Sequence, residues 1–166
     1  FGIASKKSIR SKLYQGLIKL EYRGYDSSGI SGSGVSSKLT TIKATGPIKN
    51  LKTKLTSLTR ITTGIAHTRW ATHGEPILKN THPHLSENIS IVHNGIIENY
   101  MDLKLLLKKK KYIFKSDTDS EVLMYLIEDV YKKCKSQIKL PKEEMQNYVK
   151  EIYSPFTAEQ ISSCLL

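Results

Sequence analysis

Helical and strand spacings alternate along this chain, and the alternation limits the folds that it can adopt. In residues 8–21 the apolar residues Ile9, Leu13, Leu17 and Leu20 recur every three or four positions, which predicts an amphipathic helix. Further patterns predict strands at residues 29–35, 38–43, 64–71 and 89–93, and a helix at residues 99–109. Because no repeat or long linker separates these segments, the sequence predicts one domain that contains both helices and strands.

Thr118 and Glu121 have the spacing of a capping box at the start of another helix. In such a box the threonine accepts from the first-turn N–H groups, and the glutamate reaches back to the N-cap residue. Asp119 then stands at the first helical position, where the helix dipole favours a carboxylate that can meet a cationic ligand group. A role in starting the helix also explains Asp119, and the spacing alone favours that role.

All five histidines fall between His67 and His93, which suggests either a metal site or the wall of a pocket. Zinc sites use three or four ligands at recognisable local spacings such as HExxH, and no such spacing occurs here. Arg69 lies between His67 and His73, and its permanent charge would repel a divalent ion. We therefore predict a pocket without a bound metal.

The net charge of +11 is compatible with a nucleic-acid partner, but the lysines are scattered along the 166 residues. Their densest run, residues 108–111, follows three leucines and is typical of the solvated end of a helix. No apolar run approaches the roughly 20 residues of a membrane span, and no secretory signal is visible. Cys134 and Cys164 suit neither a disulfide framework nor a metal clip. We expect a cytoplasmic protein that binds neither nucleic acid nor membrane.

Five segments occur in an order and at separations that together carry a resemblance. They are LEYRGYDSSG (20–29), GIAHTRWATHGEP (64–76), HPH (82–84), VHNGIIENY (92–100) and SDTDSEV (116–122). This set resembles the glutaminase domain of the glutamine–fructose-6-phosphate aminotransferases (isomerizing), or glucosamine-6-phosphate synthases. The resemblance covers residues 1–131, where it predicts a partial type-2 glutamine amidotransferase domain. Residues 132–166 form an unassigned tail.

The resemblance implies an α+β fold, the N-terminal-nucleophile type of four-layer α/β/β/α sandwich, here incomplete. It also implies a chemistry in which an N-terminal cysteine hydrolyses the side-chain amide of glutamine without a cofactor. The ammonia released would pass to a sugar-phosphate isomerase domain, and the full-length family forms homodimers. Related class II amidotransferases carry different versions of the arginine and tryptophan segments.

The same resemblance assigns roles to individual residues. Asn94, through its side-chain amide, and Gly95, through its N–H, match the oxyanion hole. Arg69 matches the clamp for the substrate carboxylate, since a guanidinium binds a carboxylate with two parallel bonds. Asp119 matches the group that holds the α-ammonium of glutamine. Other matched positions in the pocket or on its rim are Arg23, Trp70, Thr72, His73 and His82.

Two registers compete at the amino terminus, where the family begins Cys-Gly-Ile. Laying Phe1 over the cysteine matches Gly2 and Ile3 but requires a deletion before residue 20. Laying Phe1 over the apolar residue that follows Cys-Gly-Ile needs no gap, and we prefer it. Neither register supplies a nucleophile, so we expect a chain that is truncated at both ends and inactive as given. The alternatives are a non-catalytic glutamine-binding remnant and another class II amidotransferase.

Overall fold

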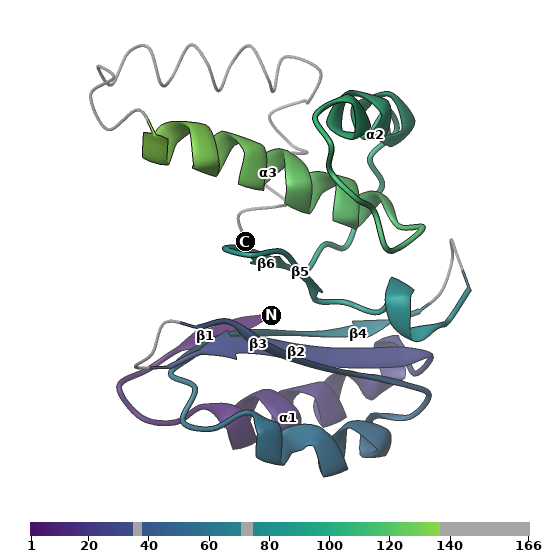
Figure 1. Ribbon diagram of the computed structural model, residues 1–166. Helices are drawn as coiled ribbons and strands as arrows, with labels where there is room; N and C mark the ends of the chain where they lie inside the picture. Colours follow the sequence, from purple (N-terminus) through teal and green to yellow (C-terminus); the bar gives the residue numbers. More distant parts are fainter. Residues whose placement is uncertain (35–37, 71–74, 137–166) are drawn as a thin grey trace.

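The computed structural model describes residues 1–34, 38–70 and 75–136, which form four stacked layers (Figure 1). Helical segments cover one face of a four-stranded sheet, a two-stranded sheet faces its other side, and two helices cover the second sheet (Figure 1). This is the α/β/β/α order of the predicted α+β sandwich. The helices are α1 (Arg10–Leu20), α2 (Tyr100–Lys109) and α3 (Asp119–Ser136), with the 3₁₀ helices η1 (Glu21–Arg23), η2 (Ile48–Ser57) and η3 (Leu78–Asn80).

The strands pair in antiparallel fashion throughout the described residues. The order in the larger sheet is β1-β4-β2-β3, and β5 pairs with β6 in the smaller one. The strands are β1 (Gly2–Ala4), β2 (Ser27–Ser33), β3 (Thr40–Thr45), β4 (Thr63–Arg69), β5 (His84–Leu85) and β6 (Ser90–Ile91). The strands predicted at residues 29–35 and 38–43 correspond to β2 and β3, which pair with Ile30 opposite Ile42.

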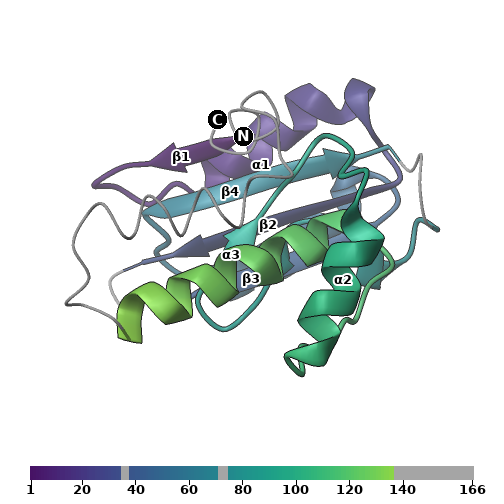
Figure 2. The ribbon, with the colours of Figure 1, turned by 90° about the horizontal axis from the view of Figure 1, so that it is seen from above.

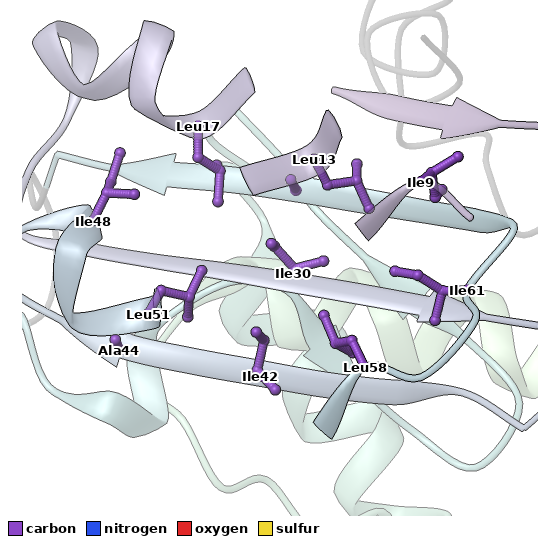
Figure 3. Packing of buried hydrophobic residues seen from close by; sticks show 11 residues of the cluster. Ile9, Leu13, Leu17, Ile30, Ile42, Ala44, Ile48, Leu51, Leu58 and Ile61 are labelled. Carbon is purple, nitrogen blue, oxygen red and sulfur yellow. The ribbon is translucent and has the colours of Figure 1, made fainter. Parts of the chain in front are cut away.

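A hydrophobic core fills the space between the larger sheet and the α1 and η2 layer (Figure 3). Leu13 and Leu17 project from α1 toward Ile30 of β2, and Leu51 of η2 closes the cluster (Figure 3). All four side chains are fully buried. The apolar spacing that predicted the first helix therefore marks the face that packs on the sheet.

A second core lies under α2 and α3, where α3 runs across β2 and β3 with α2 beside it (Figure 2). Its buried members include Leu103 and Leu107 of α2 and Val122 of α3. In the described part of the chain, no helix combines the length and the apolar character that crossing a membrane requires.

The predicted capping box at the start of α3 is half formed. Thr118 Oγ1 accepts from the N–H of Glu121 at 3.4 Å, as predicted. The Glu121 carboxylate, however, does not return to the N-cap residue. It accepts from the N–H groups of Ser116 at 2.7 Å and Lys115 at 2.9 Å, because the preceding loop bends over the first turn.

Three histidine rings fill the space between the two sheets. His67 of β4 stacks on His82 with ring centroids 4.5 Å apart, and His82 meets the edge of His84 at 4.7 Å. The Nε2 atom of His84 lies 2.9 Å from Thr118 Oγ1. Burial lowers the pKa of His67 to about 4 and that of His84 to about 3, and it lowers the pKa of His82 as well. At neutral pH the three rings are therefore uncharged.

Gly29 of β2 lies directly against the backbone of His82 and Pro83, the segment that leads into β5. A Cβ at this position would overlap the carbonyl oxygen of His82 and lie 2.9 Å from Pro83 Cδ. We predict that Gly29→Ala lowers the free energy of unfolding by about 2 to 3 kcal/mol, because the two backbones must separate. Urea denaturation checks this, with Gly2→Ala as the control, since its Cβ would make an ordinary 3.4 Å contact with Ile65. Equal stabilities of the two variants would contradict the prediction.

The neutral His84 ring makes stability depend on pH. The folded protein keeps His84 uncharged down to a pKa of about 3, whereas the unfolded chain binds a proton below about 6.5. The contribution of the neutral His84 ring to the free energy of unfolding is therefore complete above about pH 6.5, and it declines as the pH falls toward the folded pKa. We predict that, between pH 7 and pH 5, the unfolding free energy of the unaltered chain falls by roughly 2 kcal/mol more than that of the His84→Gln variant. Parallel pH profiles for the two proteins would refute it.

Candidate functional site

A cavity of about 660 Å³ opens between the two sheets, next to the end of β4 and the start of α3. Seven of the nine residues assigned to a site from the sequence line it. They are Arg23, Arg69, Trp70, His82, Asn94, Gly95 and Asp119. The other two, Thr72 and His73, lie outside the described residues.

Arg69 is the last residue of β4 and is only 7% exposed. Its Nη1 donates to the carbonyl oxygen of Glu75 at 3.3 Å, which holds the guanidinium in place. Burial lowers the pKa of Arg69, while the carboxylates of Asp26 and Asp119 raise it. A guanidinium stays protonated under all ordinary conditions, so the cavity contains a fixed positive charge within reach of two carboxylates.

Arg23 and Trp70 stand at the rim. Arg23 ends η1, and the following Gly24 lies against the end of β4, where a Cβ would come within 2.7 Å of the carbonyl carbon of Arg69. Trp70 is 57% exposed, and its ring centroid lies 5.7 Å from that of Tyr25. The η1 loop and the segment after β4 therefore form one edge of the opening.

Asp119 faces the cavity from the first position of α3, as the sequence predicted. Its Oδ2 accepts from the N–H of Ile97 at 2.9 Å, and its Oδ1 accepts from the hydroxyl of Ser120 at 3.3 Å. A carboxylate has about four lone-pair sites, so these two bonds leave capacity for a further cationic donor. Thr118 caps the helix, which leaves Oδ2 of Asp119 for the contact with Ile97 outside it.

Asn94 and Gly95 lie on the loop that follows β6, and both are exposed to the cavity. A Cβ on Gly95 would come within 2.8 Å of Nε2 of His93, so the His93 ring packs directly against this loop. The Nδ1 atom of the same ring lies 3.1 Å from Ser120 Oγ. Sequence reasoning missed His93 and Ser120, because their contact joins residues 27 positions apart.

Phe1 extends the pairing of β1 with β4 into the cavity. Its amino group donates to the carbonyl oxygen of Ala66 at 3.0 Å, and its own carbonyl accepts from Ala66 N–H at 2.8 Å. Burial lowers the pKa of this amino group. No cysteine is among the described residues that line the cavity. Among the described residues, no group of three or more His, Cys, Asp and Glu side chains is arranged so that it could hold a metal ion.

Comparisons with known proteins show which proteins the chain is similar to. Residues 67–139 match a family model described as a glutamine amidotransferase domain. The chain is 50% identical over 125 residues to a glutamine–fructose-6-phosphate aminotransferase (isomerizing) of Buchnera aphidicola subsp. Baizongia pistaciae, covering 74% of this chain and 20% of that protein. It is 48% identical over 133 residues to the enzyme of that name from Helicobacter pylori strain J99, covering 79% of this chain and 22% of that protein.

A solved structure shares the fold. Glutamine phosphoribosylpyrophosphate amidotransferase from B. subtilis, complexed with ADP and GMP, superposes with a TM-score of 0.67 at 27% identity, covering 92% of this chain and 32% of that one. The chain thus spans about a fifth of the length of the two curated relatives. From its sequence, its layers and these similarities, the chain carries a glutamine amidotransferase domain that is similar to the glutaminase domain of the glutamine–fructose-6-phosphate aminotransferases (isomerizing).

Proposed function

We propose that this cavity binds glutamine and that residues 1–131 serve as the glutamine-hydrolysing domain of an amidotransferase. One observation carries the proposal. The cavity presents a fixed cation, Arg69, and a carboxylate, Asp119, together with the Asn94–Gly95 loop. A free amino acid has one carboxylate and one ammonium group, so this charge pair matches its backbone end.

In this proposal Arg69 binds the α-carboxylate of glutamine through two parallel hydrogen bonds. Asp119 accepts from the α-ammonium with the lone pairs that Ile97 and Ser120 leave free. His82 and Trp70 supply walls and Arg23 lies at the rim, while Thr72 and His73 are assigned to the pocket by the sequence resemblance alone. The burial of Arg69 favours this assignment, because a desolvated guanidinium gains most from an anionic partner.

The side-chain amide of the substrate would then extend toward Asn94 and Gly95. These residues would stabilise the oxyanion that forms when a nucleophile attacks the amide carbon. The net reaction converts glutamine and water into glutamate and ammonia. The names of the relatives lead us to propose that the ammonia is used to convert fructose 6-phosphate into glucosamine 6-phosphate, on a sugar-phosphate domain of a homodimeric enzyme.

The second candidate function is glutamine binding without hydrolysis. It is favoured by the lining of the cavity, which contains no cysteine among the described residues. Phe1 lies beside Ala66, and its phenyl side chain has no nucleophilic atom. Release of glutamate separates the two functions, since both require glutamine to bind and only the first consumes it.

Arg69 tests the binding step. We predict that Arg69→Ala weakens the binding of L-glutamine on the order of a hundredfold, because two charge-assisted hydrogen bonds are lost. Arg69→Lys should recover little of the affinity, since an ammonium keeps the charge but loses the planar fork. Isothermal titration calorimetry with L-glutamine measures the effect.

The matched control is Arg10→Ala, which removes an arginine from α1 that donates to the Leu55 carbonyl at 3.5 Å and does not line the cavity. This control should bind glutamine as the unaltered chain does. Equal affinities of the Arg69→Ala and Arg10→Ala variants would disprove the clamp, and no heat from the unaltered chain would remove both candidate functions.

The register of the β1–β4 pairing tests the hydrolytic step. Gly2 lies opposite Ile65 and Phe1 bonds to Ala66, so a residue placed three positions before Phe1 falls opposite Arg69. We predict that adding Cys-Gly-Ile before Phe1, with a free amino group, yields glutamate release from glutamine. Adding Asn94→Ala to that variant should lower kcat by about a hundredfold or more, through loss of an oxyanion donor.

Two further variants serve as controls for this experiment. Addition of Ala-Gly-Ile should give no glutamate, because it lacks the thiol. Phe1→Cys tests the competing register, which would place the thiol opposite Ala66. Activity of Phe1→Cys together with silence of the Cys-Gly-Ile variant would show that our preferred register is wrong.

A further inference from the structure

Both ends of the loop that carries Asn94 and Gly95 are tied to one carboxylate. At the far end the N–H of Ile97 donates to Oδ2 of Asp119 at 2.9 Å. At the near end Nδ1 of His93 lies 3.1 Å from Ser120 Oγ, and the Ser120 hydroxyl donates to Oδ1 of Asp119 at 3.3 Å. The Asp119 carboxylate is therefore linked to both ends of residues 93–97, directly at Ile97 and through Ser120 at His93.

The direction of the hydrogen bonds in this chain follows from counting protons. Ser120 has a single hydroxyl proton, and Oδ1 of Asp119, which can only accept when ionised, receives it. The contact between Ser120 Oγ and His93 Nδ1 then requires His93 to be the donor. Burial lowers the pKa of His93 although Asp119 raises it, so the ring is neutral and carries one proton. That proton must sit on Nδ1, which leaves Nε2 as a lone pair.

The neighbours of His93 hold the residue in place. Nε2 lies on the side of Gly95, where a Cβ would come within 2.8 Å of it. The backbone N–H of His93 donates to Nδ1 of His82 at 3.4 Å, which adds a second tie between this residue and the buried histidines. The ring is thus held at its Nδ1 atom and packs against the loop at its Nε2 atom.

We infer that His93 and Ser120 are positioning residues, which form a relay from His93 Nδ1–H through the Ser120 hydroxyl to Asp119 and so fix Asn94 and Gly95 relative to that carboxylate. The inference rests on the proposed function, in which Asp119 receives the ammonium of glutamine and the loop receives the oxyanion. One carboxylate then sets both the recognition of the amino-acid end and the placement of the oxyanion donors.

The relay makes a prediction about the ligand-free chain. Nitrogen-15 NMR of the imidazoles should find His93 protonated on Nδ1 in the unaltered 166-residue chain and in Ser120→Thr, which keeps the hydroxyl. Ser120→Ala should lose that tautomer preference, and the Ile97 amide should exchange faster with solvent. Ser28→Ala is the matched control. It also removes a buried serine hydroxyl, but this serine lies on β2 and takes no part in the relay.

Calorimetry with L-glutamine measures the consequence for binding. Ser120→Ala should bind about tenfold more weakly than the unaltered chain, because Asp119 loses a hydrogen bond that orients it. Ser120→Thr and Ser28→Ala should stay within about twofold, since the relay is intact in both. Recovery by threonine separates positioning from a general loss of packing.

Three outcomes would overturn the inference. They are His93 protonated on Nε2 in the unaltered chain, an Ile97 amide that is insensitive to Ser120→Ala, and unchanged glutamine affinity in that variant. If the unaltered chain binds no glutamine, the proposed function fails separately. The His93 tautomer and the Ile97 exchange, both measured without ligand, then decide on the relay by themselves.

Discussion

The close approach of the His82–Pro83 backbone to Gly29 is the constraint on which the site depends. Gly29 lies opposite His67 in the β2–β4 pairing, so the missing Cβ lets His82 rest on the larger sheet and stack on the His67 ring. That contact sets the distance between the sheets. Arg69 belongs to the larger sheet, and Asp119 begins α3, the helix that covers the smaller sheet. The distance between the sheets therefore also sets the separation of these two charged side chains.

Features that depend on near neighbours were predictable from the sequence. The first helix was expected at residues 8–21 and is found at Arg10–Leu20, and Asp119 opens α3 as its place after Thr118 indicated. The bonds of Glu121 were not predictable, because they depend on how the preceding loop bends. The histidine stack was also beyond prediction, since its contacts join β4 to the segment around β5, and the sequence does not specify the distance between them.

The functional reading of Asp119 shows where spacing stops being informative. A carboxylate at a helix start is more often part of the cap, and the resemblance alone assigned it to a ligand. In the structure Thr118 makes the capping bond, while Asp119 accepts from Ile97 on a different segment. The different roles of these two adjacent residues depend on the tertiary structure, because Asp119 can accept from Ile97 only where the loop after β6 reaches the helix.

The neutrality of the histidines explains how the cavity can suit a zwitterion. Protonation of His67 or His82 would add positive charge beside Arg69, and burial opposes it by lowering the pKa of both rings. The rings therefore support the wall without competing for an anionic group. With Asp119 raising the pKa of Arg69, the two charged groups stabilise each other before any ligand arrives. A glutamine backbone, itself one cation and one anion, can replace that interaction without adding net charge to a partly buried space.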